Sequence, residues 1–492
     1  MPASVIRTDS PRPDRLIEGG GPSILCVDLD GTLVSTDLLH ESVCLLLRER
    51  PGAILRLPFW LRRGRAHLKA KLAERVLPEP ASLPYVPEVL AYLKQARASG
   101  ARTALVTASH RRHAEAVADH LGLFDEVIAS DHRENLKGRA KLDAIRQAFG
   151  DAPFDYVGDS RADLPVWREA RRALLVGPSR SVVAEVVRAG KEPRVFERPG
   201  GALKSHFRLI RPHQWTKNLL LFVPLITAHL WADPGALSRI ALAMAIFCLT
   251  ASAVYVVNDL LDLSADRRHR SKRLRPLAAG EVPIPRAFVI AAGLFLLASF
   301  ATLLLPRAFA GCLIVYIALT TGYSFHIKRK VILDVVCLAG LYTLRIIAGG
   351  AAASITISPW LLAFSMFFFL SLAFVKRYSE LIVKSSTPAT TTIEGRGYTP
   401  IDLELIQSMG PSMGAISVLV MCLYINSPDV LKLYRHPQLL WMICPILLYW
   451  VLRVWLLARR QQLHDDPIVF ALGDRISYLA GALVLLIIVL AM

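Results

Sequence analysis

The chain has 492 residues, a formal net charge of +18 at pH 7 and a mean hydropathy of +0.40, although 20% of its residues are charged. This combination argues against a uniform soluble protein, and the length allows two or more domains. Because membrane proteins concentrate Lys and Arg on their cytoplasmic side, the positive charge does not require a nucleic acid as partner.

The chain before about residue 205 has the composition of a globular protein. Residues 1–21 are polar and predict a disordered tail without a signal peptide. Strands then alternate with helices, which predicts a parallel α/β sheet in a domain of residues 22–177. Residues 178–206 are less apolar, with scattered Pro and Gly, and are interpreted as a linker. The expected strands are 24–27, 103–106, 126–128, 156–157 and 174–176.

Two acidic residues follow the first expected strand directly. Asp28 and Asp30 lie two residues apart in the sequence DLDGT. At the end of a strand, one such carboxylate can attack phosphorus while the other protonates the leaving oxygen. Gly31 allows the chain to turn sharply away from the strand. A loop with turn-forming acids is the structural alternative.

Three further polar elements follow in an order that suits phosphate chemistry. Thr107 ends the next strand, where its hydroxyl could hold a phosphoryl oxygen, and Lys137 could neutralise the phosphoryl charge. Lys141 is a rival for this place. Asp159 and Asp163, in GDSRAD, supply carboxylates of the kind that bind Mg²⁺. Open α/β sheets bind ligands at the carboxyl ends of their strands, where these acids are expected.

Together and in this order, the motifs resemble those of the haloacid dehalogenase-like phosphohydrolases over residues 23–177. The resemblance implies that Asp28 is the nucleophile and Asp30 the general acid and base. It also implies that the segment 34–85 is a helical cap that shapes substrate choice. The implied phosphoryl-binding residues are Thr107 and Lys137, and the implied Mg²⁺ ligands are Asp28, Asp30, Asp159 and Asp163. An inactive member that serves as a binding or regulatory module is an alternative.

Apolar stretches recur after the linker and predict an all-α polytopic membrane domain of residues 207–492 with about nine transmembrane helices. With the N-terminus inside, the inner loops carry 16 Lys and Arg residues and the outer loops carry four. This bias predicts a multi-pass protein of the cell membrane with a cytoplasmic N-terminal domain. The spans are expected at 218–232, 238–257, 287–305, 309–325, 332–350, 360–375, 409–426, 439–457 and 469–491.

An acidic motif, NDLLDLSAD, lies at the cytoplasmic end of the second expected span. On a helix, Asp259, Asp262 and Asp266 share one face at positions i, i+3 and i+7, and Asn258 begins the same pattern. Carboxylates at a membrane helix end are costly unless they are paired or bound to metal. Divalent cations that bridge a diphosphate would relieve their repulsion. Acids that cap an exposed helix end are the structural alternative.

Basic residues are expected on the same side of the membrane. Lys272 and Arg275 are the expected phosphate contacts in the run after the acidic motif, although the positive-inside bias also explains such a run. Arg345 lies inside an apolar span, where Arg costs about 2.5–3.5 kcal/mol on insertion scales. We therefore expect an anionic partner or Asp334 beside Arg345, with purely structural pairing as the alternative.

The acidic motif, the helices and the second polar loop resemble the UbiA superfamily of intramembrane prenyltransferases over residues 205–492. RPHQWTKN at 211–218, YSFxxK at 323–328 and GRGY at 395–398 are similar to its decaprenyl-phosphate phosphoribosyltransferase branch. The resemblance implies that Asp259, Asp262 and Asp266 hold Mg²⁺ on a diphosphate leaving group, with Asn258 assisting and with Asp259 and Asp262 central to catalysis. It also implies that Lys217, Lys328, Arg345 and Lys376 bind phosphates. The other expected substrate-binding residues of this domain are Asn258, Lys272, Arg275, Tyr323 and Asp334.

The combined hypothesis is a bifunctional membrane enzyme with two consecutive steps. The membrane domain would transfer 5-phosphoribosyl from phosphoribosyl diphosphate to a polyprenyl phosphate, and the N-terminal domain would remove the 5-phosphate. The product would be a polyprenyl-phosphoryl ribose for envelope glycans. A prenyltransferase that joins an isoprenyl diphosphate to an aromatic or apolar acceptor is the main alternative. A transporter is disfavoured because the charges cluster at one membrane face. The sequence leaves open a homo-oligomer.

Overall fold

The computed structural model describes residues 24–132, 134–198, 203–382, 397–463, 467–471 and 473–492. By internal contacts the chain forms two units, one of residues 1–210 with 256–290 and one of residues 211–255 with 291–492. The predicted N-terminal tail lies outside the described residues, as do Lys384 and Arg396 of the expected inner loops.

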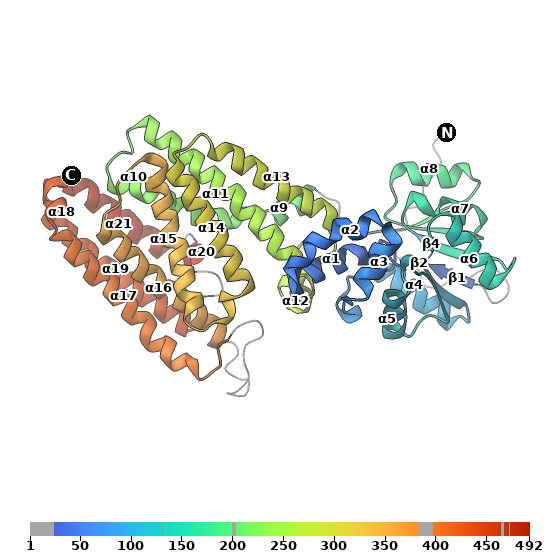
Figure 1. Cartoon of the computed structure of the whole chain (residues 1–492). Coiled ribbons are helices and arrows are strands. Elements are labelled where there is room, and N and C mark those ends of the chain that lie inside the picture. Colours follow the sequence, from blue (N-terminus) through green and yellow to red (C-terminus); the bar gives the residue numbers. More distant parts are fainter. Residues whose placement is uncertain (1–23, 133, 199–202, 383–396, 464–466, 472) are drawn as a thin grey trace. The chain divides into compact units, whose positions relative to one another are not determined.

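A six-stranded parallel sheet forms the centre of the N-terminal domain, as the alternating pattern predicts (Figure 1). Its strand order is β3-β2-β1-β4-β5-β6, and every neighbouring pair is parallel. Successive residues of a strand point to opposite faces, so Leu25 and Val27 pack in one apolar core while Ile24 and Cys26 pack in the other. The strands are β1 (Ile24–Val27), β2 (Arg102–His110), β3 (Glu126–Ser130), β4 (Phe154–Gly158), β5 (Arg172–Val176) and β6 (Arg194–Phe196).

Helices connect these strands, as parallel pairing requires. A helical insertion between β1 and α4 lies within the expected cap segment and has its own small core around Leu46, Leu68 and Leu72. The insertion contains α1 (Leu38–Glu49), η2 (Pro51–Arg56), α2 (Leu57–Arg62), α3 (Arg65–Ala73) and η3 (Pro80–Ser82). The sheet helices are α4 (Pro87–Ala98), α5 (Arg111–Leu121), α6 (Arg139–Phe149), η4 (Arg161–Asp163), α7 (Leu164–Glu169) and α8 (Arg180–Arg188).

The predicted linker 178–206 is wrong for its first part, because the α/β domain continues through it. Helix α8 buries Val182 and Val186 in the same core as β4 and β5, and β6 pairs with β5. A three-residue strand with charged neighbours gives almost no periodic signal, which explains why the sequence pattern missed it.

Seven helices among the described residues are long and apolar enough to cross a membrane. They correspond to seven of the nine expected spans. They are α11 (Pro234–Leu261), α13 (Ile284–Thr302), α14 (Arg307–Phe325), α15 (Leu333–Ala353), α16 (Pro359–Ile382), α17 (Asp402–Ile425) and the continuous stretch Pro437–Arg459, which joins η8 (Pro437–Met442) to α19 (Ile443–Arg459).

The two remaining expected spans are shorter in the structure. The first falls on η5 (Pro212–Phe222) and α10 (Val223–Thr227), where Pro224 sits in the first helical turn and the segment changes from 3₁₀ to α geometry. The last is α21 (Arg475–Ala491), an apolar helix of 17 residues, preceded by α20 (Pro467–Ala471). The other elements are α9 (Leu203–Leu209), α12 (Leu263–Arg268), η6 (Lys272–Leu274), η7 (Ile327–Arg329) and α18 (Pro428–Leu433).

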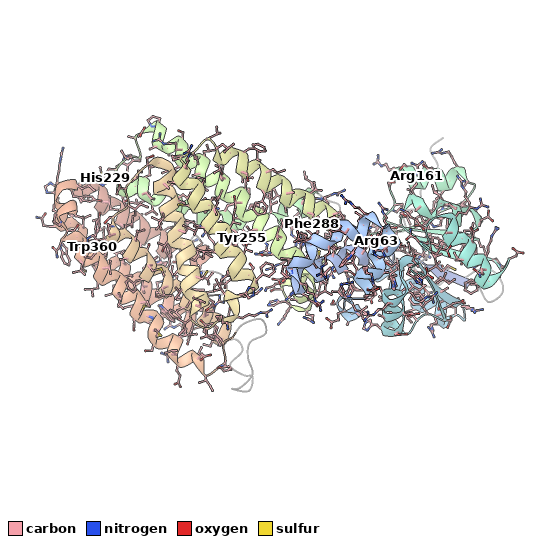
Figure 2. All side chains as sticks on the ribbon, viewed as in Figure 1. Arg63, Arg161, His229, Tyr255, Phe288 and Trp360 are labelled. Carbon is pink, nitrogen blue, oxygen red and sulfur yellow. The ribbon has the colours of Figure 1, made fainter. Side chains whose placement is uncertain are left out.

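Many large apolar side chains on these helices remain exposed, and Figure 2 labels Phe288 on α13 and Trp360 on α16 as examples. In water such a surface would be unfavourable, whereas lipid tails solvate it. The exposure pattern thus agrees with a domain of helices surrounded by lipid.

Candidate active sites

Three carboxylates meet at the carboxyl ends of the adjacent strands β1 and β4. Asp28, Asp159 and Asp163 each offer an oxygen, and these oxygens lie within 4.8 Å of one another. Asp28 and Asp163 are buried, and Asp159 is partly buried. Hard carboxylate oxygens in such a group suit Mg²⁺. Among the described residues, no other group of three or more Asp, Glu, His or Cys side chains is close enough together to hold a metal ion. Asp30, an expected ligand, is not part of this group.

Gly31 allows Asp159 to reach this cluster. Its φ is +75°, a conformation that glycine adopts without strain. A Cβ at this position would lie 2.1 Å from Asp159 Oδ2. Any side chain here would therefore displace the Asp159 carboxylate.

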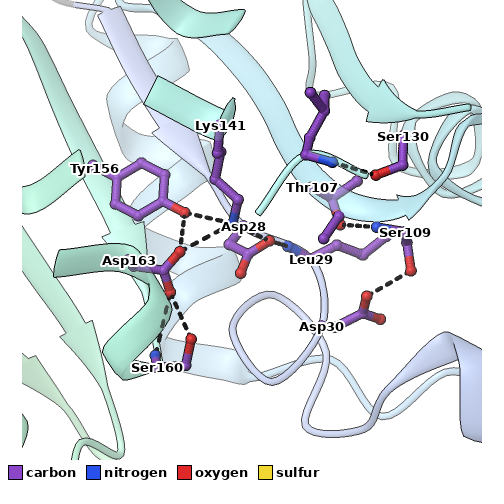
Figure 3. Close-up of polar contacts among 12 residues, drawn as sticks. Asp28, Leu29, Asp30, Thr107, Ser109, Ser130, Lys141, Tyr156, Ser160 and Asp163 are labelled. Carbon is purple, nitrogen blue, oxygen red and sulfur yellow. Dashed lines mark hydrogen bonds and ion pairs between the residues drawn. The ribbon is translucent and has the colours of Figure 1, made fainter. Parts of the chain in front are cut away.

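Lys141 on α6 lies against the candidate nucleophile (Figure 3). Its Nζ is 3.1 Å from Asp28 Oδ1, 3.0 Å from Asp163 Oδ1 and 2.8 Å from the Tyr156 hydroxyl oxygen. Lys137 is exposed. The structure therefore places the rival Lys141, rather than Lys137, beside Asp28.

Burial and mutual electrostatic interaction shift the pKa values of these side chains. Burial raises the pKa of Asp28 to about 6, and Lys141 opposes the rise. Burial alone would lower the pKa of Lys141, but the attraction of Asp28 and Asp163 outweighs it and the pKa is raised. Burial, with repulsion from Asp28 and Asp163, raises the pKa of Asp159 to about 7. A bound cation would stabilise the ionised carboxylates.

Asp30 has the properties of a proton donor. Its Oδ1 accepts a hydrogen bond from Leu38 N at 2.8 Å, and its Oδ2 lies 2.5 Å from Ser109 Oγ. Burial, assisted by the nearby Asp37, raises the pKa of Asp30 to about 8. At neutral pH the carboxyl group thus holds a proton that it can give to a leaving oxygen.

Thr107 lies on β2, three residues before its end, and Ser109 links it to this acid. It is completely buried, and its hydroxyl oxygen accepts a hydrogen bond from Ser109 N at 3.0 Å. Ser109, which contacts Asp30, and Tyr156, which contacts Lys141, were not among the expected residues. The position of Ser109, two residues after Thr107 at the end of a strand, is the signal that could have identified it.

The acidic motif of the second candidate site does not lie on one continuous helix. Helix α11 ends at Leu261, and Asp262 is the N-cap of α12 with φ −100° and ψ 14°. Asp259 and Asp266 are buried, and Arg275 Nη1 bridges them at 3.2 Å from Asp259 Oδ1 and 2.5 Å from Asp266 Oδ2. The expected phosphate contact Arg275 therefore holds the acids together, and Lys272 Nζ lies 4.0 Å from Asp266.

The helical insertion and the acidic motif belong to the same compact unit of the chain, the one that combines Met1–Ile210 with Val256–Ile290. Arg267 Nη2 lies 2.6 Å from Glu41 Oε1 on α1, with both side chains buried. Arg48 Nη1 lies 3.5 Å from Asp262 Oδ1. Glu41 also accepts a hydrogen bond from Thr36 Oγ1 at 2.8 Å.

Arg345 is buried within α15 and has only neutral partners. Its Nε donates to Asn218 Oδ1 at 2.9 Å, Nη1 donates to the Leu341 carbonyl oxygen at 2.6 Å, and Nη2 lies 3.4 Å from the Tyr316 hydroxyl. Among the described residues, no carboxylate lies within ion-pair distance of this guanidinium. Of the two expected partners of Arg345, Asp334 is therefore wrong, and an anionic substrate stays a prediction. Asn218 and Tyr316 are partners that the sequence pattern did not identify.

Asp334 takes part in a different buried network. Its Oδ2 lies 2.6 Å from Arg377 Nε, and Tyr398 donates its hydroxyl hydrogen to Oδ1 at 2.6 Å. Arg377 also donates to the Tyr323 hydroxyl at 2.9 Å and pairs with Glu380. These contacts join α14, α15 and α16, so Asp334 and Tyr323 stabilise the packing of these helices. The residues Gly395 and Arg396 of the GRGY segment lie outside the described residues.

The other expected cations occupy separate elements. Lys217 is buried on η5 with its Nζ 5.8 Å from the Tyr342 ring centre, Lys328 lies on η7, and Lys376 lies on α16 next to Arg377. Asn258 lies in the last turn of α11 before Asp259.

Comparison with known proteins agrees with both halves of the chain. Residues 221–479 match the family model of the UbiA prenyltransferase family. Residues 25–168 match that of the haloacid dehalogenase-like hydrolases.

Three relatives show how far the similarity extends. Uncharacterized protein y4nM of Sinorhizobium fredii is 40% identical over 95% of this chain and 91% of its own length. Decaprenyl-phosphate phosphoribosyltransferase of Corynebacterium glutamicum is 36% identical over 44% of this chain and 67% of its own length. Nodulation protein NoeC of Azorhizobium caulinodans is 32% identical over 54% of this chain and 85% of its own length. The chain belongs to the UbiA prenyltransferase family and carries an N-terminal haloacid dehalogenase-like hydrolase domain.

Proposed function

We propose that the membrane domain transfers a 5-phosphoribosyl group from phosphoribosyl diphosphate to a polyprenyl phosphate. The observation that carries this proposal is the buried Arg345, whose charge no carboxylate among the described residues neutralises. A buried cation without a counter-ion favours an anionic substrate. The 36% identity to a decaprenyl-phosphate phosphoribosyltransferase supports the same substrate class. Asp334, which is committed to Arg377 and Tyr398, does not resemble a second metal-binding acidic motif.

In the proposed transfer, a phosphate oxygen of the lipid attacks the anomeric carbon of the ribose. A bond forms between this oxygen and the carbon, and the carbon–oxygen bond to the diphosphate breaks. Lys217, Lys272, Lys328, Arg345 and Lys376 are the proposed cations for the phosphate groups. The acids Asp259, Asp262 and Asp266, with Asn258, are the proposed Mg²⁺ ligands, and Arg275 is the group that Mg²⁺ would replace between two of them.

The N-terminal domain is the proposed phosphatase for the 5-phosphate of the same lipid. Asp28 attacks the phosphorus atom, the ester bond to the ribose oxygen breaks, and Asp30 gives its proton to that oxygen. Water then attacks the phosphorus atom of the aspartyl phosphate, the bond between phosphorus and the Asp28 oxygen breaks, and inorganic phosphate leaves. Asp30 takes a proton from the attacking water. Mg²⁺ held by Asp28, Asp159 and Asp163 would neutralise phosphoryl charge, and Lys141 keeps Asp28 ionised and in position.

In this proposal both active sites face the cytoplasm. The excess of Lys and Arg in the expected inner loops supports a location of the N-terminal domain and the acidic motif at the cytoplasmic face of the cell membrane. A tethered second site then meets the lipid product at a high effective concentration.

The transfer step is tested with purified protein in lipid vesicles that contain polyprenyl phosphate, Mg²⁺ and radiolabelled phosphoribosyl diphosphate. We expect organic-extractable label with the wild type and with Asp233→Asn, an exposed acid at the start of α11. The Asp262→Asn variant should lose the label. Absence of lipid label with the wild type, combined with transfer of an isoprenyl diphosphate to an aromatic acceptor, would establish the alternative prenyltransferase.

A further inference from the structure

Lys69 brings a positive charge from the helical insertion to the candidate phosphatase site. It lies on α3, and its Nζ donates to the Ala108 carbonyl oxygen at 2.5 Å and to Asn135 Oδ1 at 3.1 Å. Ala108 lies between Thr107 and Ser109, the residue that contacts Asp30. The ammonium group therefore lies at the carboxyl end of β2, on the side of the site where the proton donor Asp30 is held.

Within the part of the chain that the structure describes, Lys69 forms no ion pair. Its side chain is partly buried, and among the described residues no carboxylate lies within 4.0 Å of Nζ. Both partners are neutral oxygens, and an ammonium group has three N–H donors, so one donor remains available. Burial lowers the pKa of Lys69, with some compensation from Asp30 and Asp37. A neutral side chain could join the same two oxygens without the cost of a partly buried charge.

Lys137 strengthens the positive potential at this position. It lies two residues after Asn135, which accepts a hydrogen bond from Lys69, and its charge contributes to the lowered pKa of Lys69. A cation at the end of β2, with a second one nearby in the sequence, suits a ligand with negative charge beyond the phosphoryl group that reacts.

We propose that Lys69 is a specificity-determining residue that binds a second anionic group of the phosphatase substrate, on the leaving-group side of the bond that breaks. The substrate class is a phosphate monoester that carries another phosphate, such as a sugar 5-phosphate with a phosphodiester at its anomeric carbon. This inference rests on the proposed phosphatase function and deepens it. Lys141 and the acids then bind the phosphoryl group that reacts, while Lys69 binds a second anionic group on the leaving group and so favours substrates that have one.

Two soluble substrates test this role with the full-length protein in detergent. One is ribose 5-phosphate, and the other is ribose 5-phosphate with a methyl phosphodiester at the anomeric carbon. Lys69→Met should raise KM for the diester substrate about tenfold or more, as expected for a lost charge-assisted hydrogen bond. The kcat for this substrate and both constants for ribose 5-phosphate should stay nearly unchanged. Lys69→Arg should restore most of the preference.

Lys71→Met is the matched control, because Lys71 lies on the same helix and pairs with the exposed Glu74. It should leave both substrates unaffected. If Lys69→Met lowers kcat/KM equally for both substrates, Lys69 only holds α3 against β2, and the inference is overturned. If the wild type hydrolyses neither substrate nor any other phosphate monoester, the proposed phosphatase function itself fails, and the inference fails with it.

Discussion

Lys141 Nζ lies 3.1 Å from Asp28 Oδ1, and the side chains are only 4% and 9% exposed. Burial alone disfavours the ionised form of a carboxyl group, and Lys141 opposes this effect at Asp28. The contact thus links the nucleophilicity of Asp28 to one side chain on α6. Asp163 and Tyr156 fix that side chain from two other directions.

The Lys141→Met variant should lose phosphatase activity by about 10²-fold or more in kcat, because it removes the charge that keeps Asp28 ionised and that faces the phosphoryl group. Initial rates with a soluble phosphate monoester measure the effect. Lys137→Met is the control and should retain kcat within a few-fold. A larger loss with Lys137→Met than with Lys141→Met would contradict the assignment.

The Asp30→Asn variant should lose activity in a way that depends on the leaving group. For an alkyl phosphate, loss of the proton donor should lower kcat by about 10²–10⁴-fold. For p-nitrophenyl phosphate the loss should be much smaller, because this leaving group needs no proton. An equal loss with both substrates would show that Asp30 is not the acid that protonates the leaving oxygen.

Replacement of Arg345 should separate the two activities of the chain. Arg345→Met should lower the transfer of phosphoribosyl to lipid by about tenfold or more, since it removes a charge-assisted contact to a phosphate. Phosphatase activity on a soluble monoester should persist and serves as a measure of folding for the N-terminal domain. Tyr316→Phe, which removes only one hydroxyl beside Arg345, should have a smaller effect. Unchanged transfer with Arg345→Met would contradict the role of this cation.

The buried His113 should make the N-terminal domain sensitive to acid. Its Nε2 lies 3.3 Å from the Val76 carbonyl oxygen, and burial lowers its pKa to about 4, below the usual value of about 6.5. Between these values the unfolded state binds the proton more strongly, so stability falls as the pH drops below about 6.5 and levels off below about 4. Between pH 7 and pH 5 the loss should be roughly 2 kcal/mol.

Heating at pH 7 and at pH 5, followed by a phosphatase assay at neutral pH, measures this loss. The wild type should be inactivated at a lower temperature at pH 5. The His113→Asn variant cannot be protonated at this position and should show a smaller difference between the two pH values, although it is less stable at neutral pH. An unchanged difference in the variant would assign the acid sensitivity to other groups.

Sequence patterns predicted the parts of the fold that depend on local spacing. The acids Asp28 and Asp159 follow apolar strands directly, and parallel pairing of β1 with β4 then brings the strand ends together. The choice between Lys137 and Lys141 could not be made, because it depends on the start of α6 at Arg139. Lys141 lies in the first turn of that helix and contacts Tyr156 on β4, whereas Lys137 lies in the exposed segment before the helix.

Tertiary partners of membrane residues were less predictable. Arg345 and Asp334 lie three helical turns apart on α15, so the side chains could not meet, and each found partners on other elements. The break of the helix at Asp262 also escaped prediction, because the acidic spacing suits an uninterrupted helix equally well. The partners of a buried side chain and the place where a helix breaks depend on residues from other segments of the chain, which local spacing does not reveal.

The central claim is that the two sites act in sequence on one lipid, and the lipid product of the Asp28→Asn variant tests it most directly. The variant and the wild type are given polyprenyl phosphate, phosphoribosyl diphosphate and Mg²⁺, and the lipids are analysed by mass spectrometry. The account predicts polyprenyl-phosphoryl ribose from the wild type and the same lipid with one more phosphate from Asp28→Asn. Identical lipids from both proteins would contradict it.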